Sequence, residues 1–164
     1  MEMGSLKDLF IDQLKDIYSA ETQVTKALPK MAKAASSTEL QNAFKSHLEQ
    51  TQAQLKRLEE IFDGLGKSPK GKKCKGMEGL LEEGEEMISE DADPDVLDAG
   101  LIAAAQRVEH YEISAYGTAR SYARVLGEGK ATSLLEKSLQ EESETDKKLN
   151  RLAEGQINPR AQKD

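Results

Sequence analysis

Five acidic residues occupy positions where the apolar periodicity of a helix calls for a buried side chain. Glu21, for example, lies between Ile17 and Val24 in a stripe that recurs at steps of three and four residues. The other four are Glu109, Glu112, Glu142 and Asp146. A carboxylate removed from water without a partner costs several kcal/mol or takes up a proton. Acids in such positions therefore need a buried cation.

The second helical stripe also turns polar, at His47 and Gln50. The five acids carry a formal charge of −5, which two divalent ions would largely neutralise, and His47 can add a neutral nitrogen. Inward Glu and His side chains on four helices build di-iron and di-manganese sites. The pattern predicts iron or manganese, as two ions, with a ligand set of Glu21, His47, Gln50, Glu109, Glu112, Glu142 and Asp146.

Two alternatives stay open at this stage. An acid can fall in an apolar helical stripe simply because the stripe has been assigned one residue out of register. Arg107, Arg120 or Arg124 could also pair with buried acids and form a network of ion pairs without metal. That network is the main alternative to a metal site.

The elements that must position these residues are long amphipathic helices. Apolar periodicity and capping residues predict helices over about 5–34, 37–63, 94–126 and 130–154, with a short one over about 76–89. Ser36 is the predicted cap of the second helix, and Gly64 or Gly66 its end. We expect one domain over residues 1–156 and a polar C-terminal tail over 157–164.

Short turns near residues 35 and 128 predict two antiparallel hairpins, joined by a connector long enough to run along a bundle. This is the connectivity of an all-α, ferritin-like antiparallel four-helix bundle with a long crossover that contains an additional short helix. Glu21 and Gln50 each lie about fourteen residues from the first turn. Glu112 and Glu142 lie about as far from the second, so all four are expected at one level of the bundle.

Composition limits the classes of protein. The chain has 164 residues, a net charge of −7 and a single cysteine, Cys74, which excludes a disulfide framework. No signal peptide or membrane span is visible, and the charge disfavours nucleic acid as a partner. We expect a cytoplasmic protein. The basic loop Lys67–Lys75 indicates a solvated segment; its lysines would lower the pKa of Cys74, to which no chemistry is assigned.

Several segments resemble the YciF/YciE stress-protein family. They are Tyr18-Ser19-Ala20-Glu21, His47-Leu48-Glu49, Met77-Glu78-Gly79-Leu80, Leu101 to Ala105, Val108-Glu109-His110-Tyr111-Glu112 with Ala115-Tyr116-Gly117, and Glu141-Glu142 with Asp146. The resemblance covers nearly the whole chain. It implies a ferritin-like bundle with an extra short helix, a homodimer, bacterial stress induction, a rubrerythrin-like metal centre and no settled biochemical activity.

By this resemblance, Glu21 matches the first-helix ligand, Glu109 and Glu112 a third-helix pair, and Glu142 with Asp146 the Glu/His pair of the last helix. Aspartate in place of histidine gives a harder site that suits manganese as well as iron. The second helix lacks the usual Glu-x-x-His. Gln50 offers only a neutral carbonyl, so one metal position is expected to be weak or empty.

Two functions follow. One is a metal-dependent redox protein of peroxidase or ferroxidase type, in which ferrous ions react with peroxide or dioxygen. The other is a non-catalytic structural or interaction protein of the stress response, whose metal site is incomplete or unoccupied. The sequence leaves open whether the chain is an enzyme.

Overall fold

The computed structural model describes residues 2–163, and every regular element in that range is helical. Four long helices form the body of the molecule: α1 (Leu6–Ala34), α2 (Thr38–Leu65), α4 (Pro94–Val125) and α5 (Gly129–Leu152). The shorter α3 (Lys75–Ser89) lies in the crossover, and the chain closes with a π-helical turn, η1 (Ala153–Ile157), and α6 (Asn158–Ala161).

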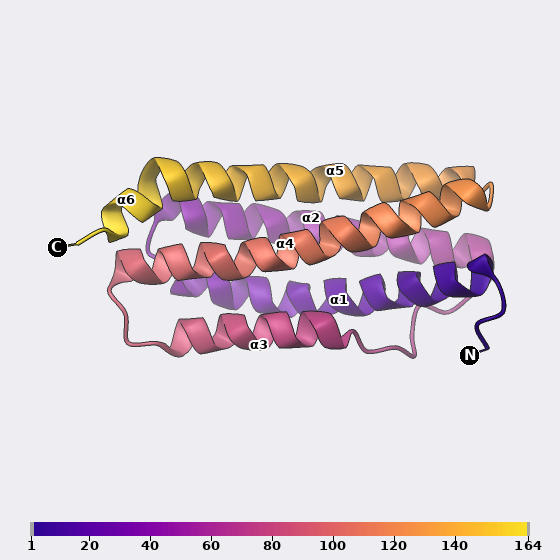
Figure 1. Cartoon of the computed structure of the whole chain (residues 1–164), viewed down its shortest axis with the longest axis horizontal. Helices are drawn as coiled ribbons and strands as arrows, with labels where there is room; N and C mark the ends of the chain where they lie inside the picture. Colours follow the sequence, from indigo (N-terminus) through magenta and orange to yellow (C-terminus); the bar gives the residue numbers. More distant parts are fainter. Residues whose placement is uncertain (1, 164) are drawn as a thin grey trace.

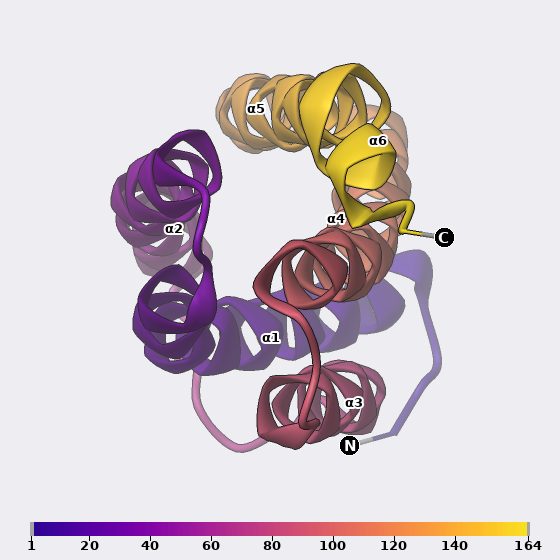
Figure 2. The same cartoon turned by 90° about the vertical axis from the view of Figure 1, so that its left-hand side faces the viewer.

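The four long helices run side by side around a common core, and α3 lies outside that ring against α1 and α4 (Figures 1 and 2). Helices α1 and α2 form one hairpin and α4 and α5 the other, with α3 spanning the connection between them. The predicted ferritin-like bundle with a helix in its long crossover is confirmed.

Local signals set most of the helix ends. The Ser5 hydroxyl accepts a hydrogen bond from the Asp8 amide at 3.1 Å, which satisfies a free donor of the first turn of α1. Gly66 ends α2 with a φ of 62°, a left-handed conformation that glycine adopts without strain. The cap of α2 is Ser37 rather than Ser36. Both serine amides instead donate to the buried Asp98 carboxylate, each at 2.8 Å, which fixes the turn between α1 and α2.

The core consists of two apolar clusters separated by a polar layer. Cluster A contains Val24, Leu28, Phe44, Leu101 and Leu149, with their neighbours. Cluster B contains Phe10, Leu14, Leu58, Phe62 and Leu135, with theirs. The polar layer lies between them on every long helix and consists of Glu21, His47, Thr51, Gln54, Glu109, Glu112, Ser138 and Glu142, all buried.

The C-terminal segment differs from the prediction. Residues 157–164 were expected to form a polar tail, but the helix continues through η1 into α6. Ala153 and Ile157 are the cause, because both side chains are buried in cluster A. The wide turn of a π-helix accommodates this burial before the last short helix begins at Asn158.

Cys74 is a structural residue at the start of α3. Its thiol caps the helix and lies 3.0 Å from Tyr111 Oη and 3.2 Å from Asp16 Oδ2. Tyr111 Oη in turn donates to the same Asp16 oxygen at 2.6 Å. Burial raises the pKa of the Cys74 thiol, so the expected lowering by lysines is wrong. Lys72 in that loop pairs with Asp12 of α1 at 2.5 Å instead.

Within residues 2–163, no helix combines the length and the apolar character that crossing a membrane requires.

Candidate metal centre

The polar layer gathers ligand-type side chains from all four long helices. Glu21 comes from α1, His47 from α2, Glu109 and Glu112 from α4, and Glu142 from α5. Ligand atoms of His47, Glu109, Glu112 and Glu142 all lie within 4.8 Å of one another. These residues converge because they lie at the same depth along the bundle, as predicted. On α4, Glu109 and Glu112 also share one face, since they are three residues apart.

Glu21 and Tyr116 form the α1 side of the polar layer. Tyr116 Oη donates a hydrogen bond to Glu21 Oε2 at 3.1 Å, and both side chains are fully enclosed. Burial raises the pKa of Tyr116 well above its ordinary value, which keeps the phenol protonated and able to donate. Burial also raises the pKa of Glu21 to about 7.

His47 faces two carboxylates. Its Nε2 lies 2.8 Å from Glu109 Oε1 and 3.9 Å from Glu142 Oε2. The contact to Glu109 falls outside hydrogen-bonding geometry, so both ring nitrogens remain without a hydrogen-bond partner. A buried imidazole in this state is suited to coordinate a metal through one nitrogen.

The carboxylates of the layer lack partners as well. Both oxygens of Glu112, both of Glu142 and one each of Glu21 and Glu109 are buried without a hydrogen bond. Buried polar atoms in native proteins are nearly always paired, so such a group of orphan atoms signals a missing partner. The donor set consists of negatively charged carboxylate oxygens and one imidazole nitrogen. Such a set fits a divalent first-row transition-metal ion.

Burial and mutual repulsion determine which of these acids hold protons. Burial, reinforced by the charge of Glu142, raises the pKa of Glu109 and of Glu112 well above its usual range. Burial acts on Glu142 in the same direction. Its interactions with the adjacent Glu109 and His47 outweigh burial, and the pKa of Glu142 lies below its usual range. Glu142 is therefore the acid of the layer that stays ionised most readily.

The arginine network that was the main alternative is absent from residues 2–163. No Lys or Arg there forms an ion pair with Glu21, Glu109, Glu112 or Glu142. Arg120 pairs with Glu136 at 2.7 Å, outside the polar layer. These four acids therefore have no lysine or arginine partner among the described residues.

Two predicted ligands lie apart from the atoms that converge. Gln50 accepts a hydrogen bond from Thr145 Oγ1 at 3.1 Å and is only half-buried. Asp146 accepts a hydrogen bond from Gln106 Nε2 at 3.3 Å and lies 3.2 Å from Nε2 of the exposed His110. Both side chains thus contact neighbours at the edge of the bundle.

Gln54 is the residue that sequence reasoning missed. It is fully buried in the polar layer, donates to Glu141 Oε1 at 3.3 Å, and helps to lower the pKa of the neighbouring Glu142. It lies seven residues, or about two turns, after His47, so both share a face. The inward face of α2 runs through His47, Gln54 and Leu58, and that spacing would have identified Gln54 as buried. The predicted apolar stripe continues through Leu55 instead, which places Gln54 outside it.

Glu141, which accepts a hydrogen bond from Gln54, is paired with an arginine. Arg57 binds Glu141 through two parallel contacts of 2.6 and 2.9 Å and also donates to Ser138 Oγ at 3.0 Å. This bidentate geometry is the strong form of an ion pair. Gln54 links the pair to the polar layer.

Fold and site together define a ferritin-like helical bundle with a buried carboxylate and histidine cluster that could hold metal. The chain belongs to the family described as Domain of unknown function (DUF892), which matches residues 5–162. It is 46% identical over 163 residues to Protein YciF of Escherichia coli (strain K12), covering 99% of this chain and 98% of that protein. The resemblance to the YciF/YciE stress proteins is confirmed.

Solved structures agree. The E. coli stress protein YciF superposes with a TM-score of 0.92 at 46% identity, over 95% of this chain and 99% of that one. YcfI of Rhodopseudomonas palustris follows at 0.88 and 44%, over 91% and 95%. A ferritin-like, diiron-carboxylate protein of Bacillus anthracis str. Ames gives 0.72 at 18% identity, over 92% and 99%, which shows a shared fold alone.

Proposed function

We propose that this chain is a stress-associated metalloprotein that holds two iron or manganese ions through Glu21, His47, Glu109, Glu112 and Glu142. One observation carries the proposal: three carboxylates and an imidazole from α2, α4 and α5 converge in the core, Glu21 of α1 lies in the same buried layer, and most of these ligand atoms are unpaired. Four carboxylates have a formal charge of −4, which two divalent ions balance. Gln50 and Asp146 stay predictions as further ligands.

The surroundings suit redox chemistry. When bound, a pair of iron or manganese ions at carboxylates supplies electron transfer to dioxygen or peroxide. Clusters A and B exclude bulk water from both sides of the polar layer. Tyr116 orients Glu21, and the raised pKa values of Glu109 and Glu112 mean that these groups release protons as metal binds.

Metal analysis is the first test. Protein purified without chelator and reconstituted anaerobically with ferrous or manganous ion should retain close to two ions per chain. Glu112→Gln should lose most of this metal. Glu144→Gln is the matched control, because Glu144 lies on α5 but is exposed and pairs with Lys147. Equal metal content in both variants would refute the proposed ligand set.

Ferrous oxidation separates the two functional hypotheses. When peroxide or dioxygen is added, ferrous ion bound to the protein should be oxidised faster than ferrous ion free in solution. A protein that binds metal without any such acceleration would instead be the non-catalytic stress protein. A cytoplasmic homodimer is part of the proposal, and cell fractionation and light scattering test it.

A further inference from the structure

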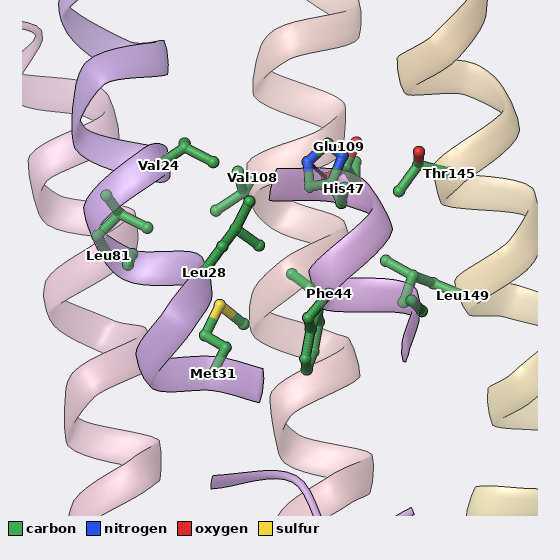
Figure 3. Close-up of a pocket in the computed structure, with 13 residues that line it drawn as sticks. Val24, Leu28, Met31, Phe44, His47, Leu81, Val108, Glu109, Thr145 and Leu149 are labelled. Atoms are coloured by element: carbon green, nitrogen blue, oxygen red, sulfur yellow. Dashed lines mark ion pairs between the residues drawn. The ribbon is translucent and has the colours of Figure 1, made fainter. Parts of the chain in front are cut away.

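Three cavities lie end to end between the surface and the metal centre. A surface hollow of about 550 Å³ opens between α1, α3 and the start of α4. A narrow cavity of about 10 Å³ follows between the same helices, and a third of about 10 Å³ lies deeper, inside the four-helix ring. Figure 3 shows the deepest one, with His47 and Glu109 on its wall.

Successive cavities in this series share wall residues. Lys30, Glu85 and Ile88 line both the surface hollow and the middle cavity. The middle and the deepest cavities share Ala27, Met31, Leu81 and Val108. We call this succession the apolar passage. It begins beside the exposed Lys30–Glu85 ion pair and ends at two residues of the proposed metal centre.

The lining determines what can enter. Between its two ends the passage is walled by aliphatic side chains, Met31 and Phe44, which offer a water molecule almost no hydrogen bonds. A water needs two to four polar partners to occupy a cavity, and small apolar cavities stay dry. Each inner cavity has room for about one small molecule. The passage therefore favours a small apolar solute over water, ions or peroxide.

Given the metal centre proposed above, on which this step rests, we infer that the apolar passage delivers dioxygen to the His47 and Glu109 side of the site. Dioxygen is the apolar one of the two oxidants considered, so the aliphatic lining favours it over peroxide. Helix α3 gains a role, because Leu81 and Gly84 on it close the groove between α1 and α4. Without α3 that groove would open to solvent.

Polar molecules have a separate approach. A cleft of about 170 Å³ between α2 and α5 also reaches His47 and is lined by Ser46, Gln50, Thr145, Lys148 and Arg151, among others. Its hydroxyl, amide and charged groups can form hydrogen bonds with water or peroxide. This cleft shares Ala43, His47 and Thr145 with the deepest cavity but none of the α3 residues. Blocking the apolar passage should therefore affect the two oxidants differently.

Two substitutions narrow the passage. Ala27→Leu places a larger side chain where the middle and deepest cavities meet. Gly84→Ala adds a methyl group to the middle cavity, with its nearest neighbour, Ala104 Cβ, at an ordinary contact distance of 3.8 Å. Ala115→Leu is the matched control, because Ala115 is also a half-buried helical alanine but packs against cluster B.

The first measurement is xenon binding to the metal-free protein by ¹²⁹Xe NMR, since xenon is an apolar probe of dry cavities. The second is the rate of ferrous oxidation with dioxygen and, separately, with peroxide. Wild type and Ala115→Leu should bind xenon, and both passage variants should bind less. Dioxygen-driven oxidation should slow by roughly tenfold in Ala27→Leu, with metal content and the peroxide rate unchanged.

Three outcomes would overturn the inference. One is the absence of xenon binding in wild type. Another is an unchanged dioxygen rate in variants that have lost the xenon site, and a third is equal slowing with both oxidants. Each leaves the metal centre intact. Failure of wild type to bind metal is a different result, which refutes the proposed function and the dioxygen role with it.

Discussion

Glu141 and Glu142 are neighbours on α5 with opposite electrostatic environments. Glu141 is 21% exposed and receives both arms of the Arg57 guanidinium. Glu142 is fully buried, and neither of its oxygens has a hydrogen-bond donor in good geometry. The rotation of about 100° between successive helical residues separates the two. One acid is therefore satisfied within the chain, and the other requires a cation from outside it.

Metal-linked stability should show the largest difference between these neighbours. At about 1,000 times the dissociation constant, bound metal adds about 4 kcal/mol to the free energy of unfolding. Glu142→Gln should lose most of that gain because it removes an ionised ligand, whereas Glu141→Gln should keep it. Urea unfolding with and without manganous ion measures both. An equal metal-dependent gain in the two variants would place Glu142 outside the site.

The pH dependence of the metal-free protein should be nearly as large. A carboxyl whose pKa is higher in the folded than in the unfolded state stabilises the fold when protonated. That contribution is complete below the unfolded pKa and is lost as pH rises through the folded value. For Glu21 the pKa rises from 4.5 to about 7, so about 3 kcal/mol should be lost over that interval.

Thermal unfolding of the metal-free protein at about pH 5 and pH 8 tests this expectation. Glu112→Gln should be more stable than wild type at the higher pH, because burial raises the pKa of Glu112 well above normal and the amide carries no charge. Stability that increases toward pH 8 in the metal-free wild type would contradict the assigned directions.

Removing the satisfied acid should have a moderate cost that is independent of metal. Glu141→Gln leaves Arg57, only 13% exposed, without its bidentate partner. Breaking a fully buried pair costs 3–5 kcal/mol. Partial exposure of this pair reduces the expected loss to about 2 kcal/mol. Urea unfolding of Glu141→Gln should be compared with that of the double variant Arg57→Leu/Glu141→Leu. If the unpaired Arg57 charge causes the loss of stability, the double variant should recover part of that loss.

The smallest effect is expected at the Cys74 cluster, another buried polar group satisfied within the chain. Tyr111→Phe removes the hydroxyl that donates to Asp16 and should cost about 1 kcal/mol. Metal content should not change, although Tyr111 is the neighbour of Glu112 in sequence. A loss of metal in Tyr111→Phe would show that this cluster supports the site.

Most of the fold could be predicted from the sequence because helix period and capping are local properties. The polar layer followed as well, since Glu21, Glu109, Glu112 and Glu142 interrupt regular stripes. Asp146 shows the limit. Four residues after Glu142 it is rotated by about 40° from that side chain, enough to meet Gln106 and His110 instead. Which side of a stripe is buried depends on the neighbouring helices, and period alone does not contain it.

The position of the polar layer between clusters A and B also affects how the chain chooses its alignment. Sliding one helix by a turn, about 5.4 Å, would carry an acid into aliphatic surroundings and leave an aliphatic residue among carboxylates. Apolar stripes alone tolerate such slips, because leucine replaces leucine at little cost. We therefore expect the buried acids of the polar layer also to fix the axial register of the helices. The bundle would then select one alignment of its helices even without bound metal.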